Sequence, residues 1–96
     1  MRSTNESTLG DLIDEMIRVY GLHDGMRRER IREVWNQKLP QAVVQRTREL
    51  SFQDGILTAR MNSAVVRNEL QLIREDIRRE LNAELGGEVI GDLLIF

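Results

Sequence analysis

A single Asp-Gly pair between two alternating segments constrains the fold of this chain more than any other feature. Asp54-Gly55 separates residues 48–53 from residues 56–61, and such a pair supplies the positive φ angles that a two-residue reversal needs. Apolar and polar positions alternate on both sides, with Leu50 and Phe52 before the turn and Leu57, Ala59 and Met61 after it. This spacing predicts a β-hairpin with one apolar face. Because a two-stranded ribbon is marginally stable alone, a helix or a third strand must complete it.

Two helices are expected before the hairpin. The first is predicted over about residues 8–20, because its apolar residues form one stripe at the helical period: Leu9, Leu12, Ile13, Met16, Ile17 and Tyr20. The second is predicted from Gly25 to Lys38, with Asp24 as its N-cap and Pro40 ending it. Its expected buried residues are Ile31, Val34, Trp35 and Leu39. His23 is expected in the turn between the two helices, and residues 41–46 are expected to form a helical turn that packs Ala42 and Val43 beneath the hairpin.

A third helix and a last strand are expected after the hairpin. The helix is predicted to start after Asn62 or Ser63 and to run to Leu85, where Gly86 ends it. Its expected core face consists of Val66, Leu70, Ile73, Ile77 and Leu81. Residues 88–96 read as a terminal strand that joins the hairpin. The order helix, helix, strand, strand, helix, strand predicts an α+β fold with a small three-stranded sheet packed by helices.

Composition limits the chain to one domain and excludes several classes of function. With 96 residues, we expect one core in residues 8–96 after a flexible N-terminus over residues 1–7. No apolar run is long enough for a membrane span or a signal peptide, so we expect a cytoplasmic protein that contacts no membrane. The chain has no cysteine, one histidine and no glycine-rich loop before a helix. We therefore expect no enzyme, no metal, no cofactor and no small-molecule substrate.

Arginine is the feature that suggests binding. Lys38 is the only lysine among fourteen basic residues, and the net charge of −2 argues against a generic nucleic-acid binder. The candidate contacts on the third helix and the hairpin are Arg60, Arg67, Gln71, Arg74 and Arg78. The alternative is that these arginines form salt bridges with neighbours such as Glu69 and Glu75. A second basic group, Arg27, Arg28, Arg30 and Arg32, alternates with Glu29 and Glu33, which can neutralise much of its field.

An apolar line on the third helix is the other candidate. Val65, Leu72 and Ala83 fall together on a side of the helix where a two-layer fold would place polar residues. They either pack under the first or second helix, or form an exposed strip of the kind that marks a partner.

The order of several short blocks resembles the DciA-like family, long catalogued as a domain of unknown function. The blocks are Leu9-Gly10-Asp11-Leu12, Trp35, Gln45-Arg46-Thr47-Arg48, Asp54-Gly55-Ile56-Leu57-Thr58, Asn62-Ser63-Ala64 and Arg67-Asn68-Glu69-Leu70. The similarity covers roughly residues 8–96. It implies a domain like the type II KH fold and a role in bacterial DNA replication, in which DciA proteins bind the replicative helicase and assist its loading onto single-stranded DNA.

Two features depart from what the resemblance implies. The Gly-x-x-Gly loop with which KH domains clamp nucleic acid is absent. The chain is also expected to be a short form, because it ends at Phe96 without the basic tail of longer family members. The first hypothesis is thus a non-enzymatic adaptor that binds the helicase through the third helix and the hairpin. The alternative is a module that binds single-stranded DNA or RNA directly.

Overall fold

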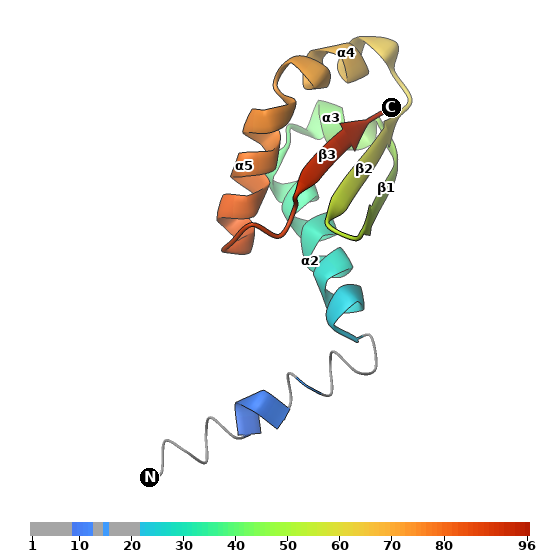
Figure 1. Cartoon of the computed structure of the whole chain (residues 1–96). Helices are drawn as coiled ribbons and strands as arrows, with labels where there is room; N and C mark the ends of the chain where they lie inside the picture. The colour runs from blue at the N-terminus through green and yellow to red at the C-terminus, as the bar shows by residue number, and fades with distance from the viewer. Residues whose placement is uncertain (1–8, 13–14, 16–21) are drawn as a thin grey trace.

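The computed structural model describes residues 9–12, 15 and 22–96, and the statements below concern these residues (Figure 1). Residues 9–12 and 15 are helical, in agreement with the predicted first helix. The rest of that helix, and the N-terminal residues 1–7 expected to be flexible, lie outside the described residues.

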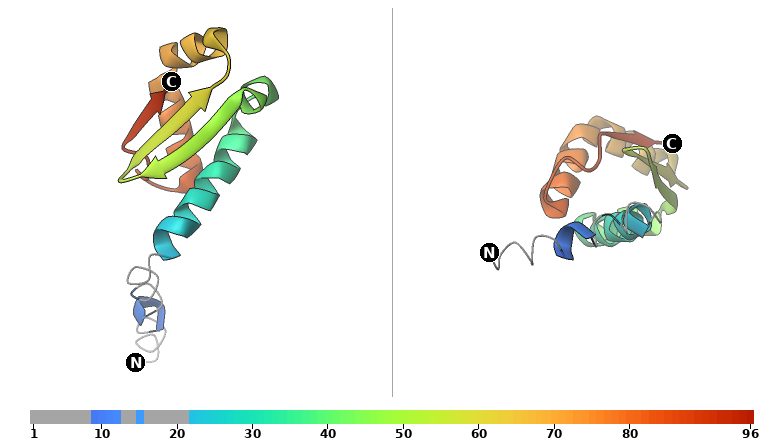
Figure 2. Two further views of the ribbon diagram at one scale, coloured as in Figure 1. Left: turned by 90° about the vertical axis from the view of Figure 1, so that its right-hand side faces the viewer. Right: turned by 60° about the horizontal axis from the view of Figure 1, so that its bottom comes forward.

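The described elements follow in the order α2 (Leu22–Lys38), α3 (Gln41–Gln45), β1 (Thr47–Gln53), β2 (Ile56–Met61), α4 (Ala64–Leu72), α5 (Arg74–Leu85) and β3 (Asp92–Ile95). The strands form one sheet in the order β1-β2-β3, in which β1 is antiparallel and β3 parallel to β2. Helices α2 and α5 lie on the same side of this sheet (Figure 2). The predicted α+β class and the small three-stranded sheet are confirmed, and the likeness to a KH domain stays a prediction.

The hairpin has the predicted turn. Asp54 and Gly55 have φ angles of 53° and 80°, the left-handed region that a two-residue reversal requires at both positions. Gln53 lies opposite Ile56 on either side of the turn, and Leu50 lies opposite Ala59. The inward side chains of β2, Leu57 and Ala59, are fully buried, so the alternating pattern identified the correct face.

The core lies between the sheet and α2, α4 and α5. Its buried apolar residues are Ile31, Val34, Trp35, Leu57, Ala59, Leu70, Ile77, Leu81, Ile90, Leu93 and Ile95. Trp35 also makes a polar contact, because its Nε1 donates to Thr47 Oγ1 at 3.1 Å. The Thr47 hydroxyl in turn donates to the carbonyl of Val43 at 2.8 Å. One buried indole thereby joins α2, α3 and the start of β1.

Three predictions about the first half of the described chain need correction. Helix α2 begins at Leu22, three residues earlier than predicted, so Asp24 is not its N-cap. His23 belongs to the first turn of this helix and not to a loop. The helical turn after Pro40 is present as α3, with Val43 packed against the core, whereas Ala42 is exposed.

The predicted third helix is in fact two helices separated at Ile73. Of the two predicted caps, Ser63 is the N-cap of α4, because its Oγ accepts a hydrogen bond from the Val66 amide at 3.2 Å. The Ile73 amide bonds to the Leu70 carbonyl at 3.2 Å, and ψ of Ile73 turns to 21°. Helix α4 packs on β2 and β3, whereas α5 packs on α2 and β3. One straight helix cannot pack in both places, and the chain changes direction at Ile73. Ile73 was predicted in the core, but it is exposed at this break.

The end of α5 is as predicted. Gly86 has a φ angle of 86°, and its amide closes the helix on the Asn82 carbonyl. Within the described part of the chain, no helix is long and apolar enough to cross a membrane.

Candidate binding surfaces

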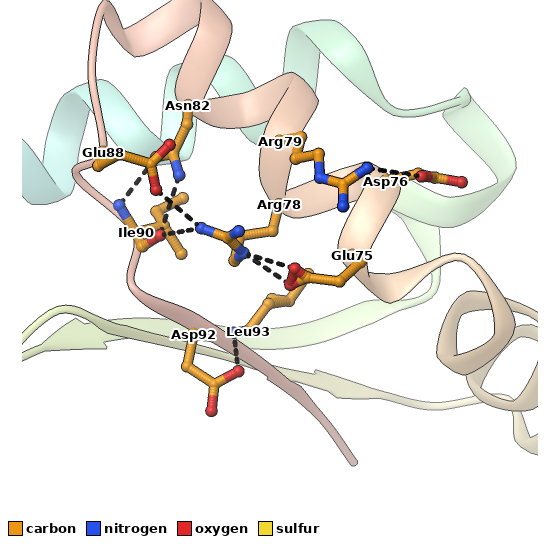
Figure 3. A network of polar contacts seen from close by, with 9 residues as sticks. All are labelled: Glu75, Asp76, Arg78, Arg79, Asn82, Glu88, Ile90, Asp92 and Leu93. Carbon is orange, nitrogen blue, oxygen red and sulfur yellow. Dashed lines mark hydrogen bonds and ion pairs between the residues drawn. The ribbon is translucent and has the colours of Figure 1, made fainter.

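Arg78, one of the predicted contact residues, is engaged inside the molecule (Figure 3). Its side chain is only 16% exposed, and its Nε lies 2.7 Å from Glu75 Oε1. Its Nη1 donates to Glu88 Oε2 at 3.1 Å and to the Ile90 carbonyl at 3.0 Å. Hydrogen bonding to Arg78 holds the pKa of Glu75 below its usual value, and the two carboxylates raise the pKa of Arg78 further. Arg78 therefore fastens α5 to the segment that enters β3.

Asn82 completes this fastening, and sequence reasoning did not single it out. Asn82 is 3% exposed, and its side-chain amide donates to the Ile90 carbonyl at 2.9 Å and accepts from the Ile90 backbone amide at 2.8 Å. Figure 3 shows Arg78 and Asn82 reaching the same short segment from one side of α5. The only signal in the sequence was an asparagine next to the core residue Leu81, one turn after Arg78.

Two other predicted contact residues also have partners within the chain. Gln71 Nε2 donates to the Ile95 carbonyl at 2.7 Å and thus covers part of the outer edge of β3. The Nε of Arg60 lies 3.2 Å from Glu49 Oε1. The guanidinium carbon of Arg60 lies 5.1 Å from the centre of the Phe96 ring.

The three candidate arginines that were predicted on one helix do not lie on one continuous helix face. Arg67 belongs to α4, whereas Arg74 and Arg78 belong to α5, and the break at Ile73 changes the helix direction between them. The alternative of salt bridging holds for Arg78, which pairs with Glu75. Among the described residues, Arg67 and Arg74 form no ion pair, so their charges remain available to a partner.

The apolar line of α4 is exposed, so its predicted alternative of packing beneath another helix is wrong. Val65 is 67% and Leu72 86% exposed, and Ile73 adjoins them at the end of the helix. We call Val65, Leu72 and Ile73 the α4 strip. Ala83 is exposed as well, but it lies on α5 and does not extend the strip. Phe96 is half exposed beside Met61, whose amide bonds to the Phe96 carbonyl shortly before α4 begins.

A groove runs between α2 and the outer edge of β1. Three neighbouring cavities of about 280, 160 and 120 Å³ follow each other from the hairpin turn toward α3. Arg27, Arg28 and Arg32 of α2 line one wall, and residues 48–53 of β1 line the other. We call this the α2–β1 groove. The sequence had suggested that Glu29 and Glu33 neutralise the arginines of α2. In the structure, Glu29 lies 4.0 Å from Arg32, and Glu33 lies 3.7 Å from Arg30.

The described part of the chain holds no candidate metal centre. No group of three or more histidine and carboxylate side chains there is placed to hold a metal ion. Exposed apolar residues lie at α4, and basic residues line the α2–β1 groove. The fold and its surfaces thus define a small α+β domain with an exposed apolar strip at α4 and a basic groove beside β1.

Comparison with known families identifies which domain it is. The chain matches the family described as "Dna[CI] antecedent, DciA" over residues 8–95, which is nearly its whole length. It therefore belongs to the DciA family, as its resemblance predicted. A search among curated proteins finds no match.

Proposed function

We propose that this chain is a non-enzymatic adaptor of bacterial DNA replication that binds the replicative helicase and assists its loading. The observation that carries the proposal is the family match, which spans residues 8–95 and leaves no described element outside it. Such a role places the protein in the cytoplasm, where the helicase meets DNA.

The surface that best supports helicase binding is the α4 strip together with Arg67 and Arg74. Val65 and Leu72 lie seven residues apart, within about 20° of each other around a helix with 3.6 residues per turn. Neighbouring exposed apolar side chains on one helix face are typical of helices that dock against a partner. Arg67 lies on another face of α4, about 160° around the helix from Val65, and Arg74 follows the break at Ile73. Neither forms an ion pair in the described chain, so both suit a partner surface that extends beyond the strip and carries carboxylates.

The decisive experiment measures binding to the replicative helicase of the same organism by interferometry, with single-stranded DNA as a parallel analyte. The double variant Val65→Glu with Leu72→Glu is expected to bind the helicase at least tenfold more weakly, because it places two charges in the contact. Both side chains are exposed, so the variant is expected to fold. Met26→Glu is the matched control, since Met26 is 62% exposed on α2, away from the strip, and its affinity should stay within twofold.

The arginine contribution is tested with Arg67→Glu combined with Arg74→Glu. We expect slower association with the helicase and a weaker dependence of its rate on salt, because steering by these charges is lost. Unchanged helicase affinity in both double variants would contradict the surface, whereas no helicase binding by the wild type would contradict the function. Binding to single-stranded DNA that weakens steeply with salt would instead support the alternative module.

A further inference from the structure

The outer edge of β1 carries backbone groups that no other strand pairs, beside the α2–β1 groove. In an antiparallel hairpin, residues alternate between pairs that exchange hydrogen bonds and pairs that do not. Gln53 and Ile56 close the two-residue turn as a bonded pair, so Leu50 and Phe52 belong to the other set. Their amides and carbonyls point away from β2. In agreement, the Phe52 carbonyl accepts its hydrogen bond from Arg28 Nε, which reaches it from α2 at 3.0 Å.

The floor of the groove is apolar. Its central cavity, of about 160 Å³, is lined by Ile31 of α2 and by Leu50, Phe52 and Leu57 of the hairpin. Leu50 and Phe52 are only half buried, although they point to the core side of the sheet. Side chains of an added segment that point in the same direction would therefore enter an apolar space beside the core.

The rim of the groove is basic. It holds Arg27, Arg28, Arg32 and Arg48 against two carboxylates, Asp54 and Glu49. Glu49 already pairs with Arg60 on the open face of the sheet. Arg30, by contrast, points to α5, where its Nη2 lies 3.9 Å from Glu84. The arginines of α2 are thus divided. On the β1 side, Arg32 lies 4.0 Å from Glu29, whereas Arg27 and Arg28 form no ion pair among the described residues.

We propose that the α2–β1 groove binds an extended acidic segment of a partner protein, which adds as a strand to the outer edge of β1. Backbone groups of Leu50 and Phe52 bond to the segment, alternate apolar side chains occupy the floor, and its carboxylates meet the arginines of α2. Arg28 leaves the Phe52 carbonyl and pairs with a carboxylate of the segment. This surface is separate from the α4 strip and does not depend on the identity of the helicase as partner.

A protein segment fits the groove better than single-stranded nucleic acid. Nucleic acid bound without sequence preference stacks its bases on exposed aromatic side chains. Phe52 is the only aromatic residue that lines the groove with part of its surface exposed, and its ring points to the core side. The free amides and carbonyls of a strand edge match another polypeptide backbone directly.

The test uses the full chain and a fluorescein-labelled ten-residue peptide that alternates valine and glutamate. We expect anisotropy to show binding, and ¹⁵N NMR to show the largest amide shifts at Leu50 and Phe52. A peptide with lysine in place of glutamate should not bind. A peptide methylated on alternate backbone nitrogens along its bonding edge should bind at least tenfold more weakly, because it cannot complete the strand pairing.

Charge reversal on the protein locates the site. Arg27→Glu with Arg32→Glu should weaken binding of the valine–glutamate peptide at least tenfold. Arg30→Glu with Arg79→Glu changes the net charge equally at exposed positions of α2 and α5 outside the groove and should leave the affinity within twofold. Equal losses in the two variants would overturn the proposal, as would no peptide binding at millimolar concentration or an unaffected N-methylated peptide. A ten-residue oligothymidine that bound in the groove while the peptide did not would also overturn it.

Discussion

β1 and β3 are the two edge strands of the sheet, but neighbouring side chains cover them differently. On the outer edge of β3, Gln71 donates to the Ile95 carbonyl and Asp92 accepts from the Leu93 amide at 2.9 Å. On the outer edge of β1, only one side chain among the described residues bonds the backbone, the exposed Arg28, which donates to the Phe52 carbonyl. Edge strands left open pair readily with other chains. This small sheet therefore has a protected edge at β3 and an open edge at β1.

The protected edge is also the better anchored one. Asn82 and Arg78 both bond the Ile90 backbone, and Ile90 is fully buried just before β3 begins. On the β1 side, Leu50 and Phe52 instead border the open space of the groove. Mutations at the two edges should therefore differ in their effect on stability.

The largest effect is expected for Asn82→Ala. This change leaves the buried Ile90 amide without its partner, while the Ile90 carbonyl keeps its bond to Arg78. An unsatisfied buried amide costs about 1–3 kcal/mol, and urea unfolding should show that loss. Asn68→Ala, at an exposed position of α4, is the control and should change stability by less than about 0.5 kcal/mol. A loss below about 1 kcal/mol for Asn82→Ala would show that the Ile90 amide finds another partner.

A paired comparison of Gln71→Ala and Arg28→Ala tests the edges directly. Removing Gln71 should cost about 1 kcal/mol, because its 2.7 Å bond to Ile95 is partly buried. Removing Arg28 should cost less than about 0.5 kcal/mol, because water replaces its exposed bond to Phe52. Hydrogen exchange should accelerate in β3 only in the first variant. Equal losses would mean that the two edges are protected alike, in conflict with the open edge proposed for β1.

Local chemistry explains which parts of this fold were predictable. The hairpin depends on Asp54-Gly55 and on a period of two, both of which are visible in ten residues. The helix break at Ile73 was not visible, because apolar spacing reports which face is buried and not whether the helix is continuous. Leu70 and Ile77 keep the same spacing across the break and are both buried, while Ile73 between them is exposed.

The candidate sites were less predictable, because the partners of polar side chains are set by packing far along the chain. Arg78 and Arg74 look alike in the sequence, but only Arg78 reaches Glu88 and Ile90 after the chain returns beyond Gly86. In the same way, Arg30 turns to Glu84 of α5 while Arg32 lines the groove. The exposure of Val65 and Leu72 followed one of two open alternatives, which only the placement of α4 decided.

The smallest expected effect is the pH dependence contributed by Glu75. Arg78 holds the pKa of Glu75 below its usual value of about 4.5 in the folded chain, so folding favours the charged carboxylate. The stabilisation is therefore complete above the unfolded pKa and is lost as the pH falls through the lower folded pKa. The stability difference between wild type and Glu75→Gln, measured by urea unfolding, should be present at pH 7 and should shrink below pH 4.5.

The effect is small because Glu75 is half exposed, where water and salt screen its charge. Raising the salt concentration at pH 7 should therefore reduce the same difference, which provides a control that leaves the carboxylate ionised. A difference that stayed constant from pH 7 to pH 3 would mean that the charge of Glu75 contributes nothing. In that case Glu88 and the Ile90 carbonyl alone would hold Arg78 at the protected edge, and the contrast with β1 would depend chiefly on Asn82 and Gln71.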